Sequence, residues 1–130
     1  MCKILVAEDS FALANLLSFV LKNAGFDVEL YRTGQSAYEA LCRQPYDILL
    51  LDQQMPKMTG IEIIQAVRLA GPNCDTPVFL CTAKSHEISR DAERLGLASS
   101  QIIHKPFSPK DLVILLKNAP EPLKVSSGTS

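Results

Sequence analysis

The stretch Ile48-Leu49-Leu50-Leu51-Asp52 places an aspartate directly after an unbroken aliphatic run. Such a run, ending at a charge, predicts a strand that is buried on both faces and opens onto a loop. Two further segments end in the same way: Glu8-Asp9 follow residues 4–7, and Lys105 follows residues 102–104. The carboxyl ends of parallel strands lie at one edge of a sheet, where ligands bind. We therefore expect three carboxylates and one ammonium group to meet in a single cleft.

Strand-like segments recur along the chain and alternate with helical periodicity. They are expected at Lys3–Ala7, Val28–Tyr31, Ile48–Leu51, Val78–Thr82 and Gln101–His104. The second is interrupted by a polar residue and suits the edge of a sheet, whereas the other four are apolar almost throughout and suit strands covered on both faces.

Apolar residues at helical spacing mark five helices. The clearest runs from Leu13 to Ala24, with Ser10 placed to cap its start and Gly25 to stop it. The last is expected to be capped by Ser108 and to carry Pro109 at its first position. The other stripes are Ala37-Ala40-Leu41, Ile63-Ile64-Val67, Ile88-Ala92-Leu95 and, for the last helix, Leu112-Leu115-Leu116. Alternating strands and helices predict an α/β fold with a doubly wound parallel sheet and helices on two faces.

Length and composition limit the classes of protein to be considered. The 130 residues allow one domain, and a formal net charge of -1 gives no overall attraction to nucleic acid or an anionic membrane. No apolar stretch approaches a membrane span, and the N-terminus lacks the pattern of a signal peptide. We expect a cytoplasmic protein with a domain at residues 1–118. Residues 119–130, rich in proline and then in serine, predict a flexible tail or linker.

The four cysteines show no Cys-x-x-Cys pair. Reduced thiols that act as packing residues are the expected reading, because a zinc site needs closer ligand spacing. The cysteines are Cys2, Cys42, Cys74 and Cys81.

The charged residues of the expected cleft suit the binding of a metal ion and a phosphoryl group. Like charges on Glu8, Asp9 and Asp52 would repel strongly unless a cation neutralised them, and such oxygen ligands suit Mg²⁺ or Mn²⁺. A metal of this kind cancels charge when a phosphoryl group enters. Lys105 could bind that group as a point charge, and the hydroxyl of Thr82 could donate to it. These parts predict a phosphoryl group on Asp52, whose carboxylate acts as the nucleophile. Glycine-rich nucleotide-binding loops are absent from the sequence.

Four short motifs, in order, carry a resemblance to a known family. They are Glu8-Asp9, Asp52 followed by Met55-Pro56 and Gly60, Thr82-Ala83, and Lys105-Pro106-Phe107. Over residues 1–118 the chain resembles the receiver domain of two-component response regulators. The resemblance implies a flavodoxin-like sheet with strand order 2-1-3-4-5.

The resemblance also implies roles for residues of this chain. Asp52 would be the phosphoacceptor, and Glu8, Asp9, Asp52 and the backbone carbonyl of Gln54 would hold Mg²⁺. Lys105 would contact the phosphate, its bond to Pro106 would be cis, and Thr82 with Ala83 would form the switch. Gln54 and Lys84 would tune the rate of self-dephosphorylation.

The implied protein is a phosphorylation switch that assists its own phosphotransfer, not an enzyme that turns over a substrate. Its phosphodonor would be a histidine kinase or a phosphotransfer protein. Its output would pass to a further domain or a partner protein, and a phosphorylation-dependent homodimer would be one form of the output. The output surface would be that of the fourth helix, fifth strand and fifth helix.

One position departs from the family pattern. Receivers usually carry an aromatic ring or histidine three residues before the lysine, and this chain has Ile102 there. A branched aliphatic side chain has no ring to move, so we expect a weaker or different coupling to the threonine. A receiver-like interaction module that works without phosphorylation is the alternative. An aspartate-nucleophile phosphohydrolase is a third hypothesis, but the second acid that this class needs is replaced by Gln54.

Simpler interpretations stand beside these roles. Glu8-Asp9 could cap the first helix, whose positive end favours carboxylates, and that role is compatible with metal binding. Thr82 could be a capping hydroxyl. His104 is expected to be a structural or surface histidine.

Overall fold

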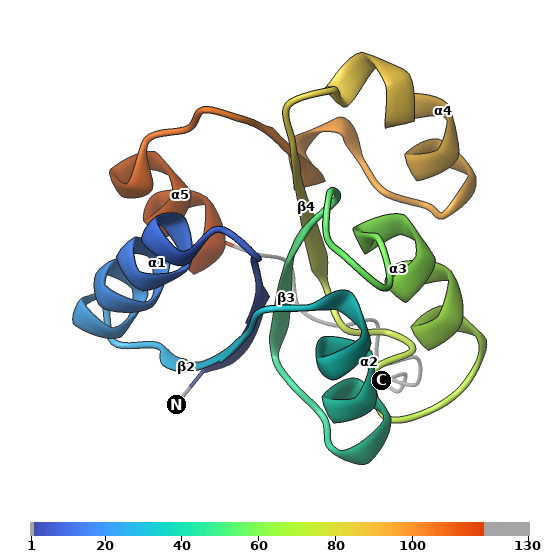
Figure 1. Cartoon of the computed structure of the whole chain (residues 1–130), viewed down its shortest axis with the longest axis horizontal. Coiled ribbons are helices and arrows are strands. Elements are labelled where there is room, and N and C mark those ends of the chain that lie inside the picture. The colour runs from blue at the N-terminus through green and yellow to red at the C-terminus, as the bar shows by residue number, and fades with distance from the viewer. Residues whose placement is uncertain (1, 119–130) are drawn as a thin grey trace.

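The computed structural model describes residues 2–118, without the side chains of residues 85, 86 and 99. Strands and helices alternate through this part of the chain (Figure 1). The predicted tail lies outside the described residues. The strands are β1 Lys3–Ala7, β2 Asp27–Tyr31, β3 Ile48–Asp52, β4 Val78–Thr82 and β5 Ile102–His104. The helices are α1 Phe11–Asn23, α2 Gly34–Arg43, α3 Gly60–Leu69, α4 Ser85–Arg94 and α5 Pro109–Lys117, with a short 3₁₀ helix, η1, at Ser99–Gln101.

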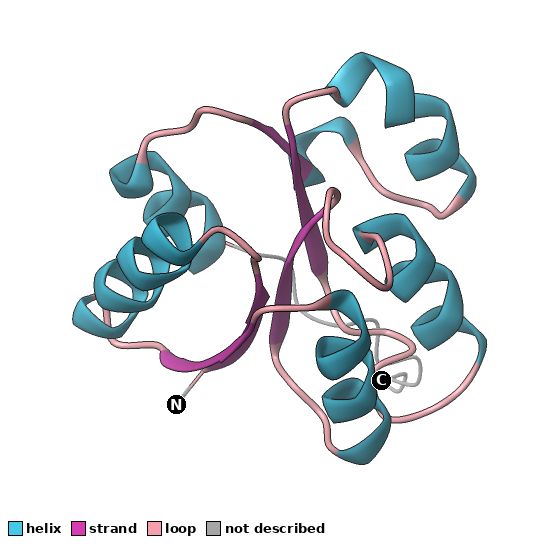
Figure 2. Ribbon diagram, viewed as in Figure 1, coloured by secondary structure: helices cyan, strands magenta, loops and turns pink. Residues whose placement is uncertain are grey.

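All described strands run parallel in the order β2-β1-β3-β4-β5. Helices α1 and α5 cover one face of the sheet, and α2, α3 and α4 cover the other (Figure 2). The predicted doubly wound fold and its strand order are thereby confirmed. None of the helices in residues 2–118 is both long and apolar enough to span a membrane.

The central strand β3 separates two apolar clusters. Leu49 and Leu51 belong to the cluster shared with α2 and α3, while Ile48 and Leu50 belong to the cluster shared with α1 and α5. Every residue of β3 is buried, which explains why its sequence shows no alternation of polar and apolar positions. The strand can therefore carry Asp52 to the sheet edge on a rigid support.

The predicted ends of the first and last helices are confirmed. The hydroxyl of Ser10 accepts a hydrogen bond from the Leu13 amide, and Ser108 caps α5, which has Pro109 at its start. Gly25 follows α1 with a φ of 99°, a conformation that favours glycine.

Two expectations are wrong. The fifth strand is shorter than predicted, because Gln101 belongs to η1, and it forms the second edge of the sheet, where His104 is exposed. Its two apolar residues nevertheless pack on opposite faces of the sheet, Ile102 against the cluster that includes α2 and α3 and Ile103 within the cluster that includes α1 and α5. Cys42 is exposed on α2 and is not a packing residue, although all four cysteines are free, as expected.

A polar network fastens the edge strand β2 to the loop before β3. Glu29 accepts hydrogen bonds through Oε1 from the hydroxyls of Tyr46 (2.5 Å) and Tyr31 (3.2 Å), and its Oε2 pairs with Lys3 at 3.2 Å. The Tyr46 hydrogen bond is the main cause that lowers the pKa of Glu29, against the effect of burial. The network thus stabilises the fold in the form with Glu29 ionised.

Tyr46→Phe is expected to lower the free energy of unfolding by about 1–2 kcal/mol, because it removes a hydrogen bond to a charged group. The difference in free energy of unfolding between wild type and the variant should reach its full size above the unfolded pKa of Glu29. It should decrease as the pH falls through the lowered folded pKa of Glu29. Urea unfolding at several pH values measures it, with Tyr38→Phe on α2 as the matched control. An effect of equal size at every pH would contradict the role given to Glu29.

Candidate functional site

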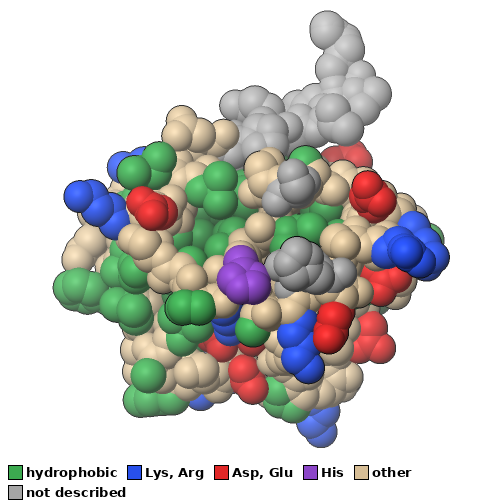
Figure 3. Space-filling model, turned by 90° about the horizontal axis from the view of Figure 1, so that it is seen from above, with side chains coloured by type: hydrophobic (Ala, Val, Ile, Leu, Met, Phe, Trp, Pro, Cys, Tyr) green, Lys and Arg blue, Asp and Glu red, His purple; other side chains and the backbone are tan. Residues whose placement is uncertain are grey.

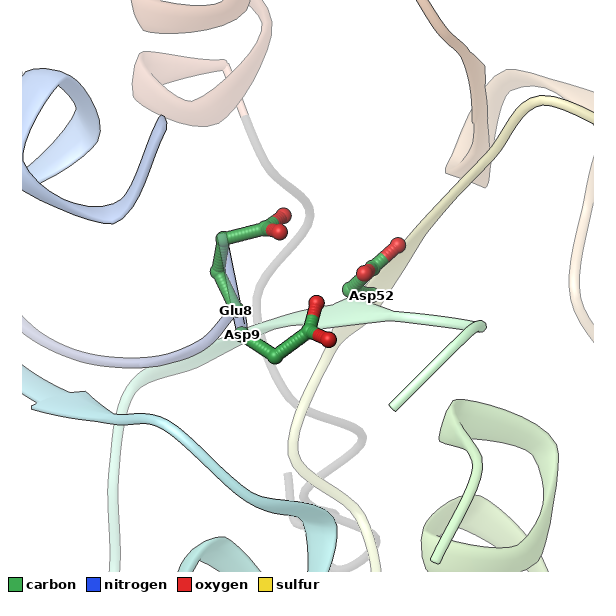
Figure 4. A group of neighbouring side chains, drawn as sticks. All are labelled: Glu8, Asp9 and Asp52. Atoms are coloured by element: carbon green, nitrogen blue, oxygen red, sulfur yellow. The ribbon is translucent and has the colours of Figure 1, made fainter. Parts of the chain in front are cut away.

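The three predicted acidic residues lie together at the carboxyl edge of the sheet (Figure 4). Glu8 and Asp9 follow β1, and Asp52 is the last residue of β3, whose register pairs Leu51 with Ala7. One carboxylate oxygen from each residue lies within 4.8 Å of the others. Parallel pairing of β1 with β3 is the physical reason that residues more than forty positions apart converge.

Lys105 reaches the same cluster from the end of β5. Its Nζ lies 3.1 Å from Oε1 of Glu8 and 3.0 Å from Oδ1 of Asp52. Both carboxylates are almost fully buried, with exposed fractions of 2% and 3%. Burial alone would lower the pKa of Lys105, but the two carboxylates outweigh it and raise that pKa. The lysine is therefore held in its charged form between two acids.

Asp52 is the electrostatically strained member of the cluster. Burial raises its pKa to about 6; Lys105 opposes the rise, and the charges of Glu8 and Asp9 add to it. Within residues 2–118 its Oδ1 is a buried acceptor whose one contact is the ion pair with Nζ of Lys105 at 3.0 Å. A buried anionic oxygen with spare acceptor capacity, beside two more carboxylates, fits a hard divalent cation.

Glu8 and Asp9 are held in different ways. Oε2 of Glu8 accepts a hydrogen bond from the amide of Ser10, the residue before α1, at 3.1 Å. Its carboxylate therefore contacts both the start of α1 and Lys105. Asp9 is exposed, and its backbone oxygen accepts a hydrogen bond from Nη2 of Arg32 at 2.8 Å. The guanidinium of Arg32 in turn lies 5.1 Å from the centre of the Phe11 ring.

The sequence reasoning missed Arg32 and Phe11. Arg32 comes directly after β2, and the strand order places β2 beside β1, so its closeness to Asp9 could have been inferred from that order. No motif in the sequence marks either residue.

The predicted switch residues lie on or directly after β4 and β5, with Thr82 as the last residue of β4 and Ile102 as the first of β5. Thr82 is fully buried, and its hydroxyl oxygen accepts a hydrogen bond from the Lys84 amide at 3.0 Å. Ala83 is exposed beside it. Ile102 is half-buried and packs against the cluster that includes α2 and α3. The Lys105–Pro106 bond is cis, as the resemblance implies.

Gln54 occupies the loop after β3, where it is exposed at the rim of the site. The same loop approaches α2 closely: a methyl group added to Gly34 would overlap the carbonyl oxygen of Met58. Glycine at position 34 therefore allows the loop to lie against the start of α2.

An apolar hollow of about 350 Å³ opens beside Lys105. Its lining is Leu13, Leu16, Ala83, Lys105, Pro106, Phe107 and Pro109. Phe11 and Phe19 on α1 are exposed by 67% and 65%. The view from above shows hydrophobic side chains gathered on one side of the molecule (Figure 3). The rim of the site is thus apolar on the side of α1.

Comparisons with known proteins agree with this geometry. The family model of the response regulator receiver domain matches residues 4–117. A transcriptional regulatory protein described as a CpxR homolog, from Haemophilus influenzae, is 35% identical over 90% of this chain and 49% of its own length. The regulatory protein SrrA of Staphylococcus aureus is 32% identical over 88% of this chain and 46% of its own. The chain therefore spans about half the length of these relatives.

A solved structure agrees as well. The chemotaxis protein CheY4 of Vibrio cholerae superposes with a TM-score of 0.82 at 30% identity, over 92% of this chain and 99% of that one. Both the matched family model and the relatives at 30% identity or more point to one assignment. This chain belongs to the family of response regulator receiver domains.

Proposed function

We propose that Asp52 accepts a phosphoryl group from a phosphohistidine on a histidine kinase or phosphotransfer protein. The observation that carries this proposal is the convergence of Glu8, Asp9, Asp52 and Lys105 at one sheet edge, with a buried Asp52 oxygen left without a hydrogen bond. Asp9, Asp52 and the backbone carbonyl of Gln54, together with Glu8, would hold Mg²⁺, with Mn²⁺ as a possible substitute. The ion would cancel the negative charge that develops on the phosphoryl oxygens.

The residues of this chain would act as follows. A carboxylate oxygen of ionised Asp52 attacks the phosphorus, a new O–P bond forms, and the N–P bond to the donor imidazole breaks. The imidazole nitrogen leaves with the electron pair of that bond and takes up a proton from water. Lys105, already 3.0 Å from Asp52, neutralises an oxygen of the transferred group. Because the pKa of Asp52 is about 6, the nucleophile is ionised at neutral pH.

The signal would follow from the added charge. A phosphoryl group brings about two negative charges, by analogy with other phosphorylated side chains. Thr82 would leave its contact with the Lys84 amide to meet that charge, and the change would pass to the surface of α4, β5 and α5. With Ile102 in place of a ring, the coupling would run through aliphatic packing. Output would go to a further domain, a partner protein or a homodimer, in the cytoplasm.

The phosphate mimic beryllofluoride tests the proposed site. We expect wild-type protein to gain thermal stability with Mg²⁺ and beryllofluoride together, and far less with either alone, because the mimic needs both the metal and the Asp52 oxygen. Asp52→Asn should lose the combined effect. Asp27→Asn, an exposed aspartate at the other end of the sheet, should keep it. A combined effect that survives in Asp52→Asn would contradict the proposal.

The second candidate function is an interaction module that works without phosphorylation, and Ile102 is the residue that favours it. A partner of such a module would bind Asp52→Ala and wild type equally tightly, before and after treatment with a phosphodonor. The buried ion pairs of Lys105 with Glu8 and Asp52 favour the phosphoacceptor instead, since pure binding does not require them.

A further inference from the structure

The three carboxylates of the site are not fixed equally. Glu8 is held by both its oxygens, to the Ser10 amide and to Lys105, and Asp52 is held by burial and by Lys105. The side chain of Asp9 is exposed, and within residues 2–118 no hydrogen bond or ion pair of its carboxylate is present. Its position therefore depends on its backbone.

The side chain of Arg32 holds the backbone of Asp9. Arg32 donates a hydrogen bond from Nη2 to the backbone oxygen of Asp9 at 2.8 Å, and its guanidinium stacks on Phe11, the first residue of α1. The contact spans two elements, since Arg32 follows β2 and Asp9 precedes α1. The amide of Glu8 also donates a hydrogen bond to the backbone oxygen of Tyr31 at 3.0 Å. The backbone is therefore held to the end of β2 both before the Asp9 side chain, at the Glu8 amide, and after it, at the Asp9 oxygen.

We propose that Arg32, braced by Phe11, is a positioning residue of the divalent-cation site, which sets the Asp9 carboxylate at the distance from Asp52 that the ion requires. This rests on the metal site of the proposed function. Outer contacts that orient ligands commonly contribute tenfold or more to metal affinity, because they remove the cost of ordering the ligand when the ion binds. Neither Arg32 nor Phe11 belongs to the acidic cluster that would hold the ion.

Charge and positioning predict opposite effects, which makes the idea testable. A positive guanidinium near the site repels a cation, so a role through charge alone predicts tighter binding when Arg32 is removed. Positioning predicts weaker binding. Arg32→Lys separates the two, because lysine keeps the charge but cannot reproduce the stacked, planar contact.

The experiment is the dissociation constant of Mg²⁺, by isothermal titration calorimetry at fixed ionic strength, for the full chain and its variants. We expect Arg32→Lys and Arg32→Ala each to weaken binding about tenfold. Phe11→Leu, which keeps an apolar residue but removes the ring, should weaken it by a smaller factor. Arg43→Lys, an exposed arginine on α2, is the matched control and should bind as wild type does.

The outcomes are distinct. If Arg32→Lys binds Mg²⁺ as wild type does, and Arg32→Ala binds equally or more tightly, Arg32 does not position the Asp9 carboxylate and the inference is wrong. If wild type itself binds no Mg²⁺, the metal site of the proposed function fails first. Thermal unfolding of each variant in EDTA checks that it is folded, and Phe11→Leu tests the same contact from its other side.

Discussion

Asp52→Asn is expected to raise the free energy of unfolding of the metal-free protein by about 3 kcal/mol at pH 8. The folded state holds Asp52 at a pKa of about 6, against an ordinary value of 3.8. Above both values the carboxylate is ionised in either state, and the folded state bears the whole cost of that charge, about 1.4 kcal/mol for each pKa unit. Asparagine removes the charge and keeps nearly the same shape.

The pH dependence of this effect has a definite sign. A carboxyl group whose folded pKa is raised disfavours folding above that pKa, and the penalty vanishes as the pH falls below the unfolded value. The gain in Asp52→Asn should therefore shrink between pH 6 and pH 4. Saturating Mg²⁺ should also reduce the gain, because at the proposed site the ion would stabilise the ionised carboxylate of the wild type.

Urea unfolding in EDTA across this pH range measures the effect, with Asp27→Asn as the control for loss of one exposed carboxylate. Equal stability of wild type and Asp52→Asn at pH 8 would contradict the view that this site stores electrostatic strain until a cation binds.

Asn73→Ala is expected to lower the free energy of unfolding by about 4 kcal/mol. Asn73 has 1% of its surface exposed and makes four hydrogen bonds with its side chain. Its Nδ2 donates to the backbone oxygens of Leu41 and Gln44, both at 2.8 Å, and its Oδ1 accepts from the Tyr46 amide and the Thr76 hydroxyl. Alanine would remove the partner of the Tyr46 amide and of the Leu41 and Gln44 oxygens, at about 1–3 kcal/mol each, while the Thr76 hydroxyl keeps its contact with the Tyr46 oxygen.

The effect should be structural and not functional. Asn73 lies in the loop before β4, at the opposite end of the sheet from Asp52, and joins that loop to the segment between α2 and β3. Urea unfolding measures the loss, with Asn15→Ala on the exposed side of α1 as the matched control. Mg²⁺ affinity of the folded fraction should be unchanged. A loss no larger than that of Asn15→Ala would contradict the role given to this network.

The sequence predicted the sheet and the site because both depend on where apolar runs end. The run that ends at Asp52 and the run that precedes Glu8 fix two neighbouring strands and their charged ends. The resemblance to receivers supplied the strand order, which periodicity alone does not contain. Ser10 and Ser108 were found because caps depend on local sequence.

What the sequence did not predict depends on contacts between distant segments. The link from Arg32 to Asp9 and the network around Asn73 join residues whose closeness follows only from the completed fold. The start of the last strand was predicted one residue too early, because Gln101 belongs to η1.

The central claim is that Asp52 carries the phosphoryl group. Wild-type protein would be incubated with Mg²⁺ and acetyl phosphate, reduced with borohydride to convert an aspartyl phosphate into homoserine, and mapped by peptide mass spectrometry. We predict homoserine at position 52 only, dependent on Mg²⁺ and absent without the phosphodonor. Conversion at another aspartate, or none at position 52 in protein that binds Mg²⁺, would contradict the claim.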